Sequence, residues 1–145
     1  MRTRVKTRRL PKFEPGMTYI SLPAQTAQWC QLLAEYGHKV LIFTQCESNA
    51  MLVQRWWSVD KVAHLPIWLD DTPNITLGYI KTQIHAHLPV SLVVIHGWEL
   101  LLFADGSLPR RSDPGLLRAL DGIARSLQVS LVVHSVIPNG KERLK

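Results

Sequence analysis

The sequence predicts one α/β domain in which helices cover both faces of a mostly parallel sheet. Three observations support this fold class. Short apolar, β-branched segments alternate with helix-like segments along the chain. The apolar segments, such as residues 92–95, lack the alternation of a half-exposed strand and therefore suit strands that are buried on both faces. The length of 145 residues is that of one ordinary domain.

Local signals place the boundaries of the predicted elements. Thr26 suits the cap of a first helix, Gly37 suits the position after its last turn, and Asp113 followed by Pro114 marks the start of the last helix. A loop rich in glycine, proline and arginine lies between residues 103 and 112. The expected strands are 17–22, 39–44, 66–69, 92–95 and 131–133, and the expected helices are 26–36, 49–57, 76–88 and 114–127.

Positive charge is concentrated at the amino terminus. The net charge is +6, and the first twelve residues hold six basic side chains and no acidic one. A basic arm of this kind can bind nucleic-acid phosphates through counterion release, although a solvated tail and an organelle transit peptide remain alternative interpretations. The arm comprises residues 1–12, and its candidate DNA-binding residues are Arg2, Arg4, Arg8 and Arg9.

The cysteine content and the hydropathy pattern indicate a cytoplasmic protein. Cys30 and Cys46 are the two cysteines, which is no disulfide framework and fits a reducing compartment. No apolar stretch follows the charged amino terminus, so a secretory signal is not expected. The longest apolar run, residues 90–104, is interrupted by polar positions and is too short to cross a bilayer. Membrane binding is therefore not expected.

The residues that follow the strands decide the function, because ligands of parallel α/β sheets bind beyond the carboxyl ends of the strands. A nucleotide site needs a glycine-rich loop and a lysine after the first strand, but residues 21–30 contain neither. A carboxylate that holds magnesium should follow the strand at residues 92–95, yet His96 and Gly97 stand there, and the nearest acid is Glu99. Hydrolysis of a nucleotide is therefore not expected, and no cofactor is predicted.

Several segments, taken in order, resemble the motor domain of DnaB-type replicative helicases, which share the RecA fold. The most specific is Asp70-Asp71-Thr72-Pro73, which follows a short strand and precedes a helix. The resemblance runs from about residue 13 to residue 145 and implies a RecA-like three-layer fold. The matching segments are FEPGMTYI (13–20), VLIFT (40–44), LPIWLDDTPNIT (65–76), LVVIHGWELL (92–101) and LVVHS (131–135) with Gly140 beyond it.

The departures from the family are as informative as the matches. By the resemblance, a shortened stretch within residues 23–30 replaces the Walker A loop, and Cys46, with Glu47 beside it, stands where the family has its catalytic glutamate. His96 takes the place of the Walker B aspartate, and the sensor glutamine position falls near Val136. Loss of one such group typically costs orders of magnitude in rate, so their joint absence predicts a protein that is not an ATPase.

The resemblance also sets an expectation for the extent of the domain. The chain ends before the family's arginine-finger segment, and it lacks the family's amino-terminal domain and linker helix. We therefore expect a degenerate, truncated relative with a single RecA-like domain over residues 13–145 and no functional Walker A loop.

Three residues at the strand ends form a weak candidate metal site. If the family's strand order holds, Cys46, His96 and His134 follow neighbouring strands and converge, with Glu47 nearby. Two histidines and a cysteine are a plausible zinc set. The interpretation favoured by the sequence is an abandoned active site whose polar residues lie at a solvated rim, so no metal is predicted.

Two further groups are candidates for binding partners. Trp56 and Trp57 are adjacent on a predicted helix, so one core face can hardly bury both, and one of them is a candidate anchor for a protein partner. Arg110 and Arg111 lie where the family has a loop that faces DNA, and they are candidate phosphate contacts. Core packing for the tryptophans and an ordinary solvated loop for the arginines are the alternatives.

Together these features predict a non-catalytic RecA-fold accessory protein of DNA metabolism. It would act by binding DNA, a protein partner or both, and the partner would be another RecA-fold protein or a second copy of the chain. The alternative is a pure protein-interaction subunit of a larger secretion, conjugation or division assembly, built on a dead ATPase core.

Overall fold

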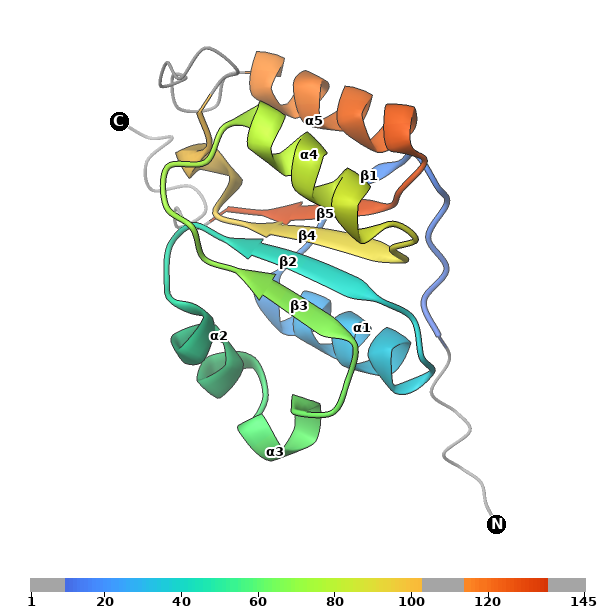
Figure 1. Cartoon of the computed structure of the whole chain (residues 1–145), viewed down its shortest axis with the longest axis vertical. Coiled ribbons are helices and arrows are strands. Elements are labelled where there is room, and N and C mark those ends of the chain that lie inside the picture. Colours follow the sequence, from blue (N-terminus) through green and yellow to red (C-terminus); the bar gives the residue numbers. More distant parts are fainter. Residues whose placement is uncertain (1–9, 103–113, 136–145) are drawn as a thin grey trace.

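The computed structural model describes residues 10–102 and 114–135, which form a five-stranded parallel sheet between two layers of helices (Figure 1). The strand order across the sheet is β1-β5-β4-β2-β3. This architecture confirms the predicted fold class, and every strand pair is parallel. The strands are β1 (Thr18–Ile20), β2 (Val40–Thr44), β3 (Ile67–Asp70), β4 (Leu92–His96) and β5 (Leu131–His134), and the helices are α1 (Pro23–Glu35), α2 (Asn49–Trp56), α3 (Val59–Val62), α4 (Leu77–His87) and α5 (Pro114–Leu127).

Two hydrophobic clusters fill the space between the sheet and its helices. Successive strand residues point to opposite faces, and both faces are apolar in β2, β4 and β5, so each face needs a helical cover. One cluster joins residues such as Leu41, Val93 and Val133 to α4 and α5, while the other joins Ile42, Val94 and their neighbours to α1 and α2. In Figure 1, α4 and α5 lie above the sheet and α1, α2 and α3 lie below it.

The first helix begins earlier than the sequence predicts. The expectation that Thr26 caps this helix is wrong: α1 begins at Pro23, and Thr26 lies one turn inside it, where its hydroxyl donates to the carbonyl of Leu22. Proline fixes φ near its helical value and needs no amide partner at the first helical position, so the helix starts almost as soon as β1 ends. Only Ser21 and Leu22 connect the two elements.

The other boundaries agree closely with the local signals. Gly37 takes a left-handed conformation, with φ of 87°, directly after α1, as its predicted position requires. Thr76 caps α4 by accepting from the amide of Tyr79, and Ser48 caps α2 by accepting from the amide of Met51. The short helix α3 and the 3₁₀ helix η2 (Trp98–Leu100) were not expected. Asp113, the expected cap of α5, lies outside the described residues.

The Asp70-Asp71-Thr72-Pro73 segment holds two helices in place. Asp71 accepts a hydrogen bond of 2.9 Å from the first amide of α2 at Asn49, and Asp70 accepts one of 2.7 Å from the Tyr79 hydroxyl of α4. Partial burial would raise the pKa of Asp70, but hydrogen bonds from Tyr79 and Thr72 outweigh it and hold this pKa below its usual value. The segment that is most specific for the family resemblance therefore has a structural role, because it joins α2 and α4 to the end of β3.

We expect Tyr79→Phe to lower the free energy of unfolding by about 1 to 2 kcal/mol, because the Asp70 carboxylate loses a charge-assisted hydrogen bond. Urea denaturation at neutral pH measures this change. Tyr36→Phe is the matched control, because Tyr36 is an exposed tyrosine at the carboxyl end of α1. Equal stability of both variants would mean that the bond to Asp70 contributes nothing.

No helix within residues 10–102 and 114–135 is long and apolar enough to cross a membrane.

Candidate functional site

The carboxyl ends of the three central strands lie in one row. The strand register pairs Thr44 of β2 with His96 of β4, and it pairs His96 with His134 of β5. In-register residues of a parallel sheet point to the same face, so both histidines continue the apolar row of Val94 and Val132 toward α1 and α2. The predicted convergence of the strand ends is therefore correct.

A chain of hydrogen bonds joins these strand ends to the segment after β2. The Nδ1 atoms of His96 and His134 lie 2.9 Å apart, so one ring donates to the other. The Nε2 atom of His96 lies 2.8 Å from Oε2 of Glu47, and Oε1 of the same carboxylate accepts from Arg55 at 2.9 Å. The result is a continuous polar network from the buried end of β5 to the exposed side chain of Arg55.

The two histidines are buried, which corrects the expectation of a solvated rim. His96 is 4% exposed and His134 is 2% exposed. The indole of Trp56 packs against both rings, with centroid distances of 5.3 and 5.5 Å. Side chains left by a drifted active site would be expected to turn outward to water, whereas here an aromatic ring covers them.

Burial also determines the charge of the pair. Desolvation lowers the pKa of His134 to about 3, and the neighbouring His96 acts in the same direction. Desolvation lowers the pKa of His96 as well, and the hydrogen bond and charge of Glu47 only partly oppose this. Both rings are therefore neutral at pH 7. The Nε2 atom of His134 is buried without a hydrogen-bond partner among the described residues.

The candidate metal ligands differ from the predicted set. Cys46, Glu47 and His96 each offer one ligand atom, and these atoms lie within 4.8 Å of one another. His134 belonged to the weak candidate set of the sequence, but its ring lies behind His96 and contacts it through Nδ1. Cys46 is exposed, and its thiol pKa is raised by partial burial and by the charge of Glu47.

Backbone contacts fix the loop that carries these ligands. The amide of Gln45 donates to the carbonyl of His96 at 3.0 Å, and the Thr44 hydroxyl donates to the carbonyl of Glu47 at 3.0 Å. The Gln45 side chain donates to the carbonyl of Thr72 at 2.8 Å. Sequence reasoning placed Glu47 near the site but missed Gln45 and Arg55. The local sequence pattern does not indicate which side chains will bond to residues elsewhere in the chain.

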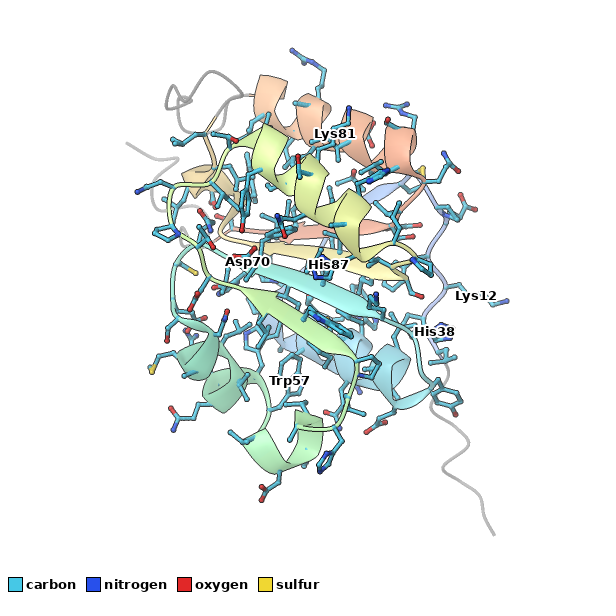
Figure 2. All side chains as sticks on the ribbon, viewed as in Figure 1. Lys12, His38, Trp57, Asp70, Lys81 and His87 are labelled. Carbon is cyan, nitrogen blue, oxygen red and sulfur yellow. The ribbon has the colours of Figure 1, made fainter. Side chains whose placement is uncertain are left out.

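Trp56 and Trp57 are both half-buried, so neither protrudes as an isolated anchor. Trp57, which is labelled in Figure 2, donates through Nε1 to the carbonyl of Ala27 at 2.9 Å. Trp56 packs on the histidine pair. The two most exposed large apolar side chains of the described residues lie elsewhere, at the end of β1 and in the connection to α1. Ile20 is 76% exposed and Leu22 is 74% exposed, and the sequence did not single out this surface.

The predicted DNA-binding residues lie outside the described part of the chain. Arg2, Arg4, Arg8 and Arg9 precede residue 10, and both Arg110 and Arg111 fall within residues 103–113. The Val136 position and Gly140 also lie beyond residue 135. These assignments stay predictions.

Solved structures share this architecture over most of the chain. A structure described as a DnaB-like replicative helicase and its interactions with primase matches with a TM-score of 0.69 and 13% identity, over 90% of this chain and 41% of that one. A second solved structure, described as an ATPase domain, matches with a TM-score of 0.65 and 13% identity, over 87% of this chain and 58% of that one. The fold is the RecA-like fold of these structures.

A sequence comparison agrees with the structural one. The replicative DNA helicase DnaB of Nostoc sp. (strain PCC 7120 / SAG 25.82 / UTEX 2576) is 32% identical over 89 residues, which is 59% of this chain and 10% of that helicase. No protein-family model matches the chain. The chain thus spans only a small part of the curated DnaB protein to which it is similar.

Proposed function

We propose that the protein is a non-catalytic, DnaB-like accessory protein of DNA metabolism that binds DNA, a protein partner or both. The observation that carries this proposal is the neutral His96–His134 pair at the ends of the central strands. Nucleotide-dependent motors need charge at this edge of the sheet, where metal ions bridge phosphate oxygens. The end of β4 offers neither a carboxylate for magnesium nor a cation for phosphate, and the Glu47 carboxylate beside it is already held by His96 and Arg55.

The connection between β1 and α1 supports the same proposal. A phosphate-binding loop offers several free backbone amides and a lysine to the phosphates. Here the connection is Ser21 and Leu22 alone, and the Ser21 amide donates to the carbonyl of Val133 at 3.2 Å. The first turn of α1 begins with Pro23, which has no amide proton to offer. Nucleotide hydrolysis is therefore not part of the proposed function, and no cofactor is needed.

DNA binding through the basic arm is expected to depend steeply on salt. If Arg2, Arg4, Arg8 and Arg9 each neutralise one phosphate, these four contacts alone should make the affinity for duplex DNA fall roughly 100-fold between about 50 and 200 mM salt. Fluorescence anisotropy of a labelled duplex, measured across this range, gives the slope. Replacing the four arginines by glutamine in the full chain should remove most of it.

The control for this experiment separates the two predicted DNA surfaces. Arg110→Gln with Arg111→Gln should reduce the slope by about two phosphate contacts and leave the contribution of the arm intact. A slope unchanged by the fourfold substitution would contradict DNA binding through the arm. ATP hydrolysis stimulated by DNA in the same preparations would contradict the non-catalytic role.

The β1 edge favours a second candidate function, a protein-interaction subunit without DNA affinity. β1 pairs with β5 on one side and has no partner strand on the other within the described residues. Ile20 and Leu22 lie exposed at its end, and exposed apolar side chains along a sheet edge are typical of protein contacts. One structural neighbour was described with its interactions with primase, so a replication protein is the partner class that we propose first. Trp56 and Trp57 remain proposed contacts with a protein partner, but only through the parts of their side chains that are exposed.

A further inference from the structure

We propose that Cys46, Glu47 and His96 bind one Zn²⁺ ion at the carboxyl ends of β2 and β4, with the fourth position open to solvent. The site is independent of the proposed function, because it needs neither DNA nor a partner. Its ligand atoms are the Cys46 sulfur, Oε2 of Glu47 and Nε2 of His96. Zinc takes sulfur, imidazole nitrogen and carboxylate oxygen readily, whereas magnesium prefers oxygen ligands alone.

The distances between the ligand atoms suit this ion after small side-chain movements. The three ligand atoms lie within 4.8 Å of one another. Four-coordinate zinc, with bonds of about 2.0 to 2.3 Å, separates its ligand atoms by about 3.3 to 3.7 Å. Nε2 of His96 and Oε2 of Glu47 are closer than this, at 2.8 Å, as expected where a proton lies between them instead of a metal. Rotation of the exposed Cys46 side chain can bring its sulfur to the remaining corner.

The surroundings of His96 hold its ring in a metal-binding orientation. A metal-bound histidine usually donates its second ring nitrogen to a fixed acceptor, which sets the tautomer and the ring angle. Here Nδ1 of His96 faces Nδ1 of His134 at 2.9 Å, and Trp56 packs against both rings. With zinc on Nε2, His96 carries its proton on Nδ1 and donates it to His134. His134 is thus a positioning residue for the site.

The surroundings of Glu47 complete the arrangement. Arg55 holds Oε1 at 2.9 Å, which leaves Oε2 directed at His96. The Thr44 hydroxyl also holds the backbone carbonyl of Glu47. A thiolate from Cys46 and the Glu47 carboxylate balance the two charges of the ion, so binding releases the thiol proton of Cys46 and leaves the ion and its ligands neutral together. The ion would cross-link the turn before α2 to the end of β4.

Cobalt substitution tests the site directly. The full-length protein, stripped with a chelator and reduced, is titrated with Co²⁺ under anaerobic conditions. We expect one equivalent to give the strong visible absorption of four-coordinate cobalt and a thiolate-to-cobalt charge-transfer band. One equivalent of Zn²⁺ should abolish both, and an excess of Mg²⁺ should not. Absence of these bands, together with no zinc retained against a weak chelator, would overturn the proposal.

Three variants assign the ligands. Cys46→Ser, at an exposed position, should fold normally and lose the charge-transfer band, and Glu47→Gln should keep that band but bind more weakly. His134→Gln should weaken zinc binding roughly 10- to 100-fold and retain the charge-transfer band, as loss of a supporting hydrogen bond predicts. His64→Gln is the matched control, because His64 is exposed and lies outside the site. Wild-type cobalt spectra from Cys46→Ser would refute the assignment of that ligand and with it the site.

Discussion

Acidification from pH 6.5 to pH 5 is expected to cost about 2 kcal/mol of folding free energy through His134 alone. Burial lowers the pKa of this residue from an ordinary 6.5 to about 3 in the folded protein. Between these two values the unfolded chain binds a proton that the folded protein does not bind. The stability contributed by the neutral ring is therefore complete above pH 6.5 and is lost progressively as the pH falls toward 3.

Urea denaturation at pH 7, 6 and 5 measures this dependence, with a chelator present so that no metal contributes. His134→Gln is the informative variant, because an amide can still hydrogen-bond His96 but does not titrate. We expect the free energy of unfolding of this variant to fall less with acidification than that of the wild type. The loss between pH 7 and pH 5 should be smaller by up to about 2 kcal/mol. His96 is shifted in the same direction and should leave a residual dependence in the variant. Parallel curves for the two proteins would show that His134 is not buried as a neutral base.

His96→Asp, which places an acid at the end of β4, is expected to lower the free energy of unfolding by about 3 to 5 kcal/mol at neutral pH. The new carboxylate would be buried, and it would face the Glu47 carboxylate that now contacts Nε2 of His96. Two like charges close together in a buried position cannot both stay ionised without a large cost. We expect no gain of ATP hydrolysis, because the connection from β1 to α1 remains unchanged.

His96→Asn separates the effect of the charge from that of the lost ring. It removes the same contacts with Trp56 and His134 as the aspartate variant. The difference between the two variants in the free energy of unfolding therefore measures the effect of the carboxylate charge. That difference in stability should become smaller as the pH falls, because a protonated aspartic acid is neutral and can donate a hydrogen bond to Glu47. Equal stability of the two variants at pH 7 would mean that the network tolerates a second negative charge.

The sheet could be predicted from the sequence because its signal is local. Residues 40–44, 92–95 and 131–133 are short runs of large apolar side chains without alternation, and such runs suit strands that are covered on both faces. The strand order came from the family resemblance, since no local pattern encodes it. The structure has that order, with β2, β4 and β5 adjacent.

The candidate site was predicted only in outline, because its decisive property is burial. The family resemblance implied that Cys46, His96 and His134 lie at one edge, but it could not show that Trp56 would cover the histidine rings. That contact joins the last turn of α2 to two strand ends, and it depends on how the helix sits over the sheet. The replacement of His134 by Glu47 in the ligand set follows from the same packing, which turns His134 toward the interior.

The pairing of β1 with β5 has a consequence for the order in which the domain assembles. Strands β2, β3 and β4 are close in the chain and can pair as soon as they are synthesised, whereas β1 must wait for β5, the last strand of the described chain. Such non-local pairing is slow, because a long loop must close before any contact rewards it. During that interval β1 lacks the strand with which it pairs in the folded domain. The amino-terminal segment is therefore the part of the domain most in need of protection before synthesis is complete.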